Sequence, residues 1–458
     1  MTDTTIRTST PPQDAPPAPP AYFLSLTVEN FRCFGLAQTL DLSRGENRPA
    51  PWTIILGENG VGKTTLLQCL SAFRPDPDDF FDYSAINPRK VTYLNYGPFI
   101  ALYEGASGRI GVRRKSEESR IHLTFCSRNG LQERSPKAQV KHVSVSLLDN
   151  LIKIDPLDTE VENLICYGYG ASRRMGKSSL SEQRTDDTTA SLFSDDVDLI
   201  NAEEWLLQAD YAASRAPKNN TRAAQRRDQI KEILKVLLQD IDIKDVRFSD
   251  PEEELSVPSV EFHTPYGWVR LKDLSLGSRT LITWMVDLAS RLFNRYPKSA
   301  NPLAEPAVVL VDEIDLHLHP RWQRTLLRFL SERFPNTQFI ATAHSPLVVQ
   351  AAEDANIVLL RREGDHVVID NDVERIKNWR VDQILTSELF GLESARPPQV
   401  SPALEERKRI LSKARLTKAD EKRLAALEAQ IGDLPTGETP EDLQAMDIIR
   451  RAATLLKS

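Results

Sequence analysis

The sequence is poor in cysteine, and the few cysteines it has are scattered. Its 458 residues include only Cys33, Cys69, Cys126 and Cys166, and no two of these form a CxxC pair. A disulfide framework would need more cysteines at closer spacing in a chain of this length. We therefore interpret all four as reduced thiols of a cytoplasmic protein.

Long apolar runs are also missing. No segment approaches the roughly 18 consecutive apolar residues that a membrane-spanning helix needs. Residues 1–20 consist mostly of Thr, Pro, Ala and Asp, without the apolar stretch of a secretory signal, and we expect them to form a disordered leader. The sequence thus predicts a protein with no membrane association.

Positive charge is not in excess either. The net charge is −7, which does not favour nucleic-acid binding over the whole surface, although a local basic face remains open. Arginines cluster near residues 109–115, 173–177 and 222–227, and we interpret such runs first as solvated faces, although they could meet phosphates. In the stretch 168–173, turn glycines could aim Arg173, in a role that the sequence leaves open. With 40% hydrophobic and 27% charged residues, the chain has the composition of a globular protein with a sizeable core.

Apolar patterning predicts an α/β protein with a mixed sheet. Short β-like runs alternate with amphipathic helical segments from residue 21 to about 375, with a region at about 75–275 that we expect to hold a helical lobe. We expect residues 376–458 to be helical, with an antiparallel pair around Thr417. Its apolar face would be formed by Leu404, Leu411, Leu424, Leu427 and Ile431.

The strongest motif is a glycine-rich loop between an apolar strand (52–56) and a helix (64–73). Its residues are Gly57, Glu58, Asn59, Gly60, Val61, Gly62, Lys63 and Thr64, which satisfy GxxxxGK[ST]. Glycines let backbone N–H groups surround a phosphate, and the helix N-terminus adds its dipole. We expect Lys63 to reach the β- and γ-phosphates of ATP, Thr64 to bind Mg²⁺, and Thr65 to contribute to nucleotide binding.

A second apolar strand ends in two acids. Residues 308–311 are all apolar, and Asp312 and Glu313 follow directly. We expect Asp312 to hold Mg²⁺ and Glu313 to act as the general base that activates water. Two adjacent acids after a buried strand would be costly without a cation nearby.

Histidines follow the strand at 308–311 and a further predicted strand at 338–342. His344 lies at the end of a third apolar strand (338–342), where it can contact the γ-phosphate and the attacking water. His317 and His319 lie two residues apart after the acidic pair. We interpret these two as part of a turn rather than as metal ligands, since no third ligand accompanies them.

Leu274, Ser275, Leu276 and Gly277 precede a helix, between the phosphate loop and the acidic pair. This order of segments resembles that of ABC ATPases, although Leu276 and Ser278 depart from the LSGGQ pattern. The resemblance implies an ABC-type P-loop head in which Ser275 and Gly277 contact the nucleotide held by a second copy. A homodimer is therefore expected, and larger homo-oligomers stay open.

The segment Asn30, Phe31, Arg32, Cys33 and Phe34 resembles the opening of the RecF, SMC and OLD-like branch of these ATPases, which would place Arg32 near the nucleotide. The segments 312–320 and 342–346 resemble bacterial AAA family ATPases of that branch, and the segments 379–385 and 389–392 resemble the PtuA-like ATPases of bacterial Septu and retron antiphage systems. That resemblance implies regulation of a separate nuclease, with an HNH nuclease favoured.

Three alternatives stay open. A RecF-like repair ATPase would bind DNA directly, and a transporter head fits the motifs less well. A Toprim nuclease would need an acidic pair such as Asp370 and Asp372, but no preceding glutamate strand accompanies it, so we interpret 370–372 as a turn. The trigger for hydrolysis is not encoded in any motif that we can identify.

Overall fold

The computed structural model describes the larger part of the chain in two compact units. The described residues are 19–74, 118–128, 130–131, 139–148, 151–155, 163–177, 187–215, 221–238, 243–249, 258–352, 354–373, 379–392, 395, 401–411, 413 and 417–431. The expected leader at 1–18 and the basic cluster at 109–115 lie outside them. One unit is Met1–His344 with Asp354–Asp372, and the other is Ser345–Glu353 with Val373–Ser458.

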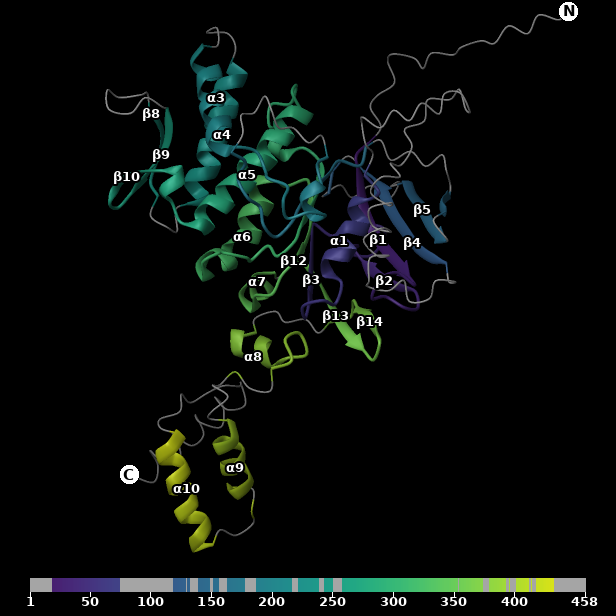
Figure 1. The fold of residues 1–458 in the computed structure, drawn as a ribbon, viewed down its shortest axis with the longest axis vertical. Helices are drawn as coiled ribbons and strands as arrows, with labels where there is room; N and C mark the ends of the chain where they lie inside the picture. Colours follow the sequence, from purple (N-terminus) through teal and green to yellow (C-terminus); the bar gives the residue numbers. More distant parts are fainter. Residues whose placement is uncertain are drawn as a thin grey trace, which may run out of the picture. The chain divides into compact units, whose positions relative to one another are not determined.

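A six-stranded sheet runs through the first unit (Figure 1). Its neighbours pair in parallel except for the last strand, β14, which is antiparallel to β13. In spatial order the strands are β14 (His366–Asp370), β13 (Asn356–Glu363), β3 (Trp52–Gly57), β12 (Thr337–Thr342), β11 (Ala307–Val311) and β7 (Cys166–Tyr169).

The central strands β11 and β12 are buried along their whole length, as expected for strands covered on both faces. Carboxyl ends of parallel strands meet at one edge of a sheet. The segments after β3, β11 and β12 are therefore brought together, and these are the segments that carry the phosphate loop, the acidic pair and His344.

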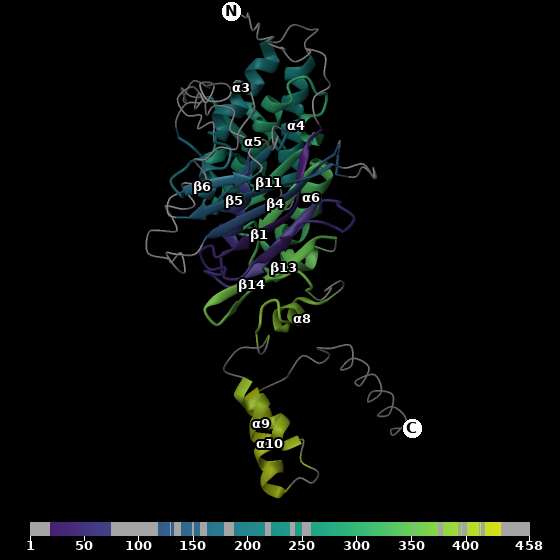
Figure 2. The ribbon, with the colours of Figure 1, turned by 90° about the vertical axis from the view of Figure 1, so that its right-hand side faces the viewer.

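An antiparallel sheet adds a second layer, and its strands run side by side in Figure 2. Their order is β2 (Gln38–Asp41), β1 (Ala21–Glu29), β4 (Ser119–Ser127), β5 (Gln139–Leu148) and β6 (Leu151–Asp155). Helix α1 (Lys63–Ser71) shares one hydrophobic core with this sheet and the parallel one. Leu26, Leu66, Phe125, Val308 and Ile340 belong to that core.

A helical lobe completes the first unit. It contains α3 (Ala202–Arg215), α4 (Thr221–Leu237), α5 (Leu276–Arg295) and a three-stranded antiparallel sheet of β8 (Val246–Ser249), β9 (Ser259–Thr264) and β10 (Gly267–Arg270). Helix α5 begins after Ser275, whose side chain accepts a hydrogen bond from the Ser278 N–H and caps the helix. Helix α6 (Pro320–Arg333) begins with a proline, which fits the first turn of a helix.

The second unit is helical where it is described. It comprises α7 (Pro346–Ala351), α8 (Val381–Thr386), α9 (Ser401–Leu411) and α10 (Lys418–Ile431). Helices α9 and α10 pack through Ala403, Ile410, Leu424 and Leu427. The expected faces of α10 are correct, but on α9 the buried positions are shifted by one residue, and Leu411 is 48% exposed. Among the described helices, none is long and apolar enough to cross a membrane.

Candidate functional site

The phosphate loop lies between β3 and α1, where its sequence requires it. Gly60 and Gly62 have φ angles of 81° and 90°, in the left-handed region that favours glycine. A Cβ atom on Gly62 would lie 2.5 Å from Cys33 Sγ, so a larger residue is also excluded by space. The first N–H groups of an α-helix have no partner within the helix, so the N-terminus of α1 is suited to an anion.

Lys63 is held over this loop. Its Nζ donates to the carbonyl oxygens of Gly57 and Glu58, at 2.8 and 2.7 Å. Burial lowers the pKa of Lys63, while the carboxylates of Asp312, Glu313 and Asp315 oppose that shift. An ammonium has three donors, so Lys63 can also donate to a phosphate oxygen.

Two hydroxyl groups orient the first acid of the pair. Thr64 Oγ1 donates to Asp312 Oδ2 at 2.6 Å, and Thr342 Oγ1 donates to Asp312 Oδ1 at 2.5 Å. Asp312 is only 6% exposed. Because Mg²⁺ prefers hydroxyl, carboxylate and water oxygens, the adjacent oxygens of Thr64 and Asp312 fit this ion.

The backbone at Glu313 is strained, with a φ angle of 47° at a residue that is not glycine. Its N–H donates to Thr342 Oγ1 at 2.7 Å, and its carbonyl oxygen accepts from Arg173 at 2.8 Å. Backbone strain of this kind is typical of functional sites whose surroundings fix the conformation.

His344 follows β12 on the same edge of the sheet. Its backbone N–H faces both carboxylate oxygens of Asp315, at 3.2 and 3.1 Å, while the residue itself is exposed. Asp315 thus ties the segment after β11 to the segment after β12.

Arg32 also lies at this site. Its φ angle is 51°, and its guanidinium donates to Thr65 Oγ1 at 3.1 Å and to Gln68 Oε1 at 2.8 Å. Gln68 in turn donates to the carbonyl of Leu192. Arg32 is therefore held against the first turns of α1, beside the phosphate loop.

These residues line one cavity of about 480 Å³. Its lining consists of Arg32, Cys33, Asn59, Gly60, Gly62, Lys63, Thr64, Thr65, Asp312, Glu313 and His344. Gly57 and Glu58 contribute through the carbonyls that hold Lys63. The loop, the acidic pair and the histidine were assigned to one nucleotide site from separate segments of sequence, and the fold brings those segments together.

Ser275 and Gly277 lie elsewhere, outside the lining of this cavity. Ser275 is exposed at the start of α5, and its hydroxyl is 2.8 Å from that of Ser278. Gly277 packs against the 313–318 turn, since a Cβ atom there would lie 2.3 Å from the His317 carbonyl oxygen.

Two residues that shape the site are not assigned to it by the sequence patterns. Thr342 bridges Asp312 and Glu313, and its only signal was its position two residues before His344. Arg173 had been grouped with Arg174 in a solvated basic cluster. The structure corrects this: Arg173 is 2% exposed and bonds behind the acidic pair, whereas Arg174 faces Asp196 and Asp198 at the surface.

The remaining candidate ligands have structural roles. The His319 side chain accepts from the Arg321 N–H at the start of α6. Asp370 pairs with Arg361, and Asn371 accepts from the Asp41 N–H. Across the described ranges, there is no group of three or more His, Cys, Asp or Glu residues that could hold a metal ion.

A phosphate loop after β3, an acidic pair after the parallel strand β11, and a capped LSxG segment on a helical lobe together define an ABC-type P-loop head. The chain belongs to the family described as "AAA domain, putative AbiEii toxin, Type IV TA system", whose model matches residues 53–350.

Known relatives agree with this assignment. Over 361 residues the chain is 27% identical to "Septu protein PtuA" of Bacillus mycoides (strain KBAB4), covering 78% of this chain and 43% of that protein. Over 159 residues it is 35% identical to "Retron Ec83 probable ATPase" of Escherichia coli, covering 34% of this chain and 28% of that protein. The matches thus span less than half of either relative. The expected likeness to PtuA-like ATPases is confirmed.

Among solved structures, the SMC head domain from Thermotoga maritima matches with a TM-score of 0.39 and 15% identity, over 77% of this chain and 99% of that chain.

Proposed function

We propose that this protein binds ATP with Mg²⁺ and hydrolyses it to ADP and phosphate. The observation that supports this best is the convergence of the phosphate loop, Asp312, Glu313 and His344 on a single cavity. Hydrolysis of a nucleoside triphosphate needs N–H donors around the phosphates, a cation site, and a base that takes a proton from the attacking water. Residues for all three functions lie in this cavity.

Each residue would have a distinct role. The N-terminus of α1 and Lys63 would bind the β- and γ-phosphates. Thr64 and Asp312 would hold Mg²⁺, which when bound neutralises charge on the phosphates. Glu313 would take a proton from the attacking water, and His344 would contact the γ-phosphate. Arg32 and Thr65 would complete the nucleotide site from the side of α1.

The complete site would need a second copy of the chain. Ser275 and Gly277 are outside the cavity, and Ser275 is exposed at a capped helix N-terminus, a place suited to an anion. We propose that two heads close head to tail around ATP, each presenting its Ser275 to the triphosphate that the other holds. Each head would give its Ser275 to the partner and receive the partner's Ser275. This reciprocal contact corresponds to a dimer with two-fold symmetry.

Two substitutions test the hydrolysis. Glu313→Gln removes the base but leaves the phosphate cradle, so turnover should fall by roughly 100-fold or more while ATP affinity is kept. Lys63→Ala should weaken ATP binding itself. Steady-state phosphate release and a nucleotide titration separate these effects. Glu332→Gln, on the exposed face of α6, is the matched control. Unchanged turnover in Glu313→Gln would place the base elsewhere.

We further propose that ATP turnover regulates a separate nuclease in antiphage defence, with an HNH nuclease as the favoured partner. The support is the likeness to Septu protein PtuA and to a retron ATPase. Affinity-tagged protein, co-expressed with the product of a neighbouring open reading frame, should recover a nuclease whose cleavage changes in the Glu313→Gln variant. Salt-dependent DNA binding by the chain alone, with no nuclease recovered, would instead favour a RecF-like repair role.

A further inference from the structure

We propose that Arg173 is a positioning residue for ATP hydrolysis, which fixes the backbone of Asp312 and Glu313 and links it to the helix that begins at Ser275. The proposal rests on the ATPase function proposed above. Arg173 lies behind the acidic pair and outside the lining of the cavity, so it would act through Glu313 and not on the nucleotide.

The contacts of Arg173 are directed at two adjacent carbonyl groups. Its Nη1 donates to the Asp312 carbonyl oxygen at 2.7 Å, and its Nη2 donates to the Glu313 carbonyl oxygen at 2.8 Å. A guanidinium is a planar fork with donors at fixed spacing, so one side chain can hold two neighbouring peptide groups in register. A lysine has a compact ammonium and cannot reproduce this geometry.

Burial makes these contacts strong. Arg173 is 2% exposed, and desolvation lowers its pKa to about 10, while the nearby carboxylates of Asp312, Asp315 and Glu313 favour the charged form. The guanidinium therefore stays protonated at neutral pH. Hydrogen bonds from a charged donor in a water-poor environment are stronger than those between neutral groups.

Glu313 is the residue that most needs such support. Its positive φ angle is unfavourable for a side chain with a Cβ atom, and its peptide groups are held on both sides. Thr342 accepts its N–H, and Arg173 bonds its carbonyl oxygen. Loss of either contact would let the backbone relax and would turn the carboxylate away from the position it has in the cavity.

Arg173 also contacts helix α5. Its guanidinium carbon lies 5.7 Å from the centre of the Trp284 ring, and Tyr169 meets the same ring edge to face, with ring centroids 6.0 Å apart. The Tyr169 carbonyl accepts the Asp312 N–H at 2.8 Å. Arg173 and Tyr169 thus hold the Asp312 backbone from two sides while both pack on Trp284.

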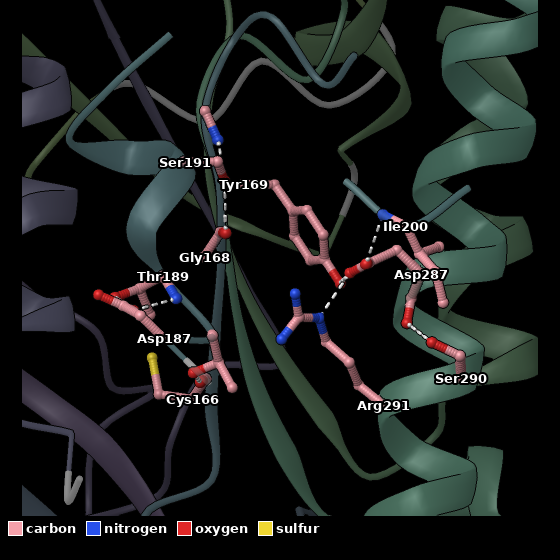
Figure 3. A network of polar contacts seen from close by, with 12 residues as sticks. Cys166, Gly168, Tyr169, Asp187, Thr189, Ser191, Ile200, Asp287, Ser290 and Arg291 are labelled. Carbon is pink, nitrogen blue, oxygen red and sulfur yellow. Dashed lines mark hydrogen bonds and ion pairs between the residues drawn. The ribbon is translucent and has the colours of Figure 1, made fainter. Parts of the chain in front are cut away.

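A buried polar network fixes this part of α5 (Figure 3). Asp287, one turn beyond Trp284, accepts from the Tyr169 hydroxyl at 2.9 Å, from Arg291 at 2.6 Å and from the Ile200 N–H at 3.3 Å. Because α5 starts at Ser275, a displacement of that helix by a bound partner would shift Trp284 and Asp287 together. Helix α5 thus joins the exposed Ser275 to Trp284, and Arg173 joins Trp284 to the backbone of Glu313.

The test compares Arg173→Gln and Arg173→Lys with Arg174→Gln in the full-length protein. Arg174 is the adjacent arginine, half exposed and paired with surface aspartates, so its variant should match wild type. Arg173→Gln should lower kcat for ATP roughly 10- to 100-fold, as loss of a supporting contact typically does, with little change in KM. The kcat of Arg173→Lys should lie between those of Arg173→Gln and Arg174→Gln, since lysine keeps the charge but can make only one of the two contacts.

The double variant Arg173→Gln with Glu313→Gln should be no slower than Glu313→Gln alone, because both changes remove the same function. A merely structural role would instead lower thermal stability and raise KM, with additive losses in the double variant. Equal kcat in wild type and in both folded Arg173 variants would overturn the role of Arg173 and leave the ATPase standing. Wild-type protein without turnover would overturn the proposed function itself.

Discussion

The two halves of the proposed nucleotide site differ in how far one chain completes them. On the phosphate-loop side, Lys63 is 7% exposed and Asp312 is 6% exposed, and their polar atoms bond to neighbours within the chain. On the other side, Ser275 is exposed and Leu276 is 55% exposed. The first half is preorganised, whereas the second presents a capped helix end and an apolar side chain at the surface. This difference is the physical reason to expect that a second copy completes the site.

The largest effect is expected from a change of charge at Ser275 that keeps the helix cap. Asp and Asn both cap helices as well as Ser, so neither Ser275→Asp nor Ser275→Asn should unfold α5. Only Asp would place a carboxylate against the partner's triphosphate. We expect Ser275→Asp to lose at least about 10-fold in turnover, with ATP-dependent dimerisation lost and ATP binding kept.

Phosphate release, nucleotide titration and light scattering of the same preparations would separate these outcomes. Ser275→Asn is the matched control for size and capping, and it should retain far more turnover than Ser275→Asp. Equal activity of Ser275→Asp and Ser275→Asn would mean that no triphosphate approaches this helix end.

A smaller effect is expected from the packing that positions the exposed half. In Gly277→Ala the new Cβ atom would meet the His317 carbonyl oxygen, a backbone group that cannot move alone. We expect a loss of about 1–3 kcal/mol in the free energy of unfolding, as for other overpacked sites. Denaturant unfolding should detect it, with Ser278→Ala on the same helix turn as the comparison. A stability equal to wild type would show that α5 is not pinned against the 313–318 turn.

The smallest expected effect concerns the α9–α10 pair, far from the chemistry in sequence. Hydrogen bonds from Lys413, and then from the backbone and side chain of Thr417, lower the pKa of Asp420 to about 2. A carboxyl whose folded pKa is depressed stabilises the fold fully above its ordinary pKa, and this contribution is lost as the pH falls through the folded value.

Hydrogen exchange of α10 in the full-length protein would measure how much the Asp420 carboxylate stabilises the α9–α10 pair. Protection should be weaker in Asp420→Asn than in wild type at pH 6, and the difference should shrink between about pH 4 and pH 2. A difference independent of pH would show that charge on Asp420 contributes nothing to the pair.

What the sequence could predict was set by how local each signal is. The phosphate loop and the acidic pair are contiguous segments with one chemical use, so residues 57–65, Asp312 and Glu313 could be assigned to one candidate site from the sequence alone. The α/β class followed from short apolar runs such as 308–311 and 339–341, which are typical of buried strands.

The supporting contacts could not be predicted because they depend on distant parts of the chain. Arg173 bonds residues that lie about 140 positions later in the sequence. The glycines in 168–173 indicated that an arginine could be aimed from this turn, but nothing in the local segment says which groups Arg173 would bond. The register of α9 was missed for a related reason. Ala403 and Leu404 are both apolar, and only the packing partner decides which of them is buried.

The central claim is that the phosphate loop of one chain works with the Ser275 of another. The most direct test mixes two variants, Glu313→Gln and Ser275→Asp, each of which should have much lower turnover than wild type when it is alone. If chains exchange freely, turnover should rise well above that of either variant, to at most about a quarter of the wild-type value. At most half of the dimers are mixed, and each mixed dimer contains one intact composite site and one in which the new carboxylate faces a triphosphate. A mixture as inactive as its two components, with exchange of chains verified, would contradict the account.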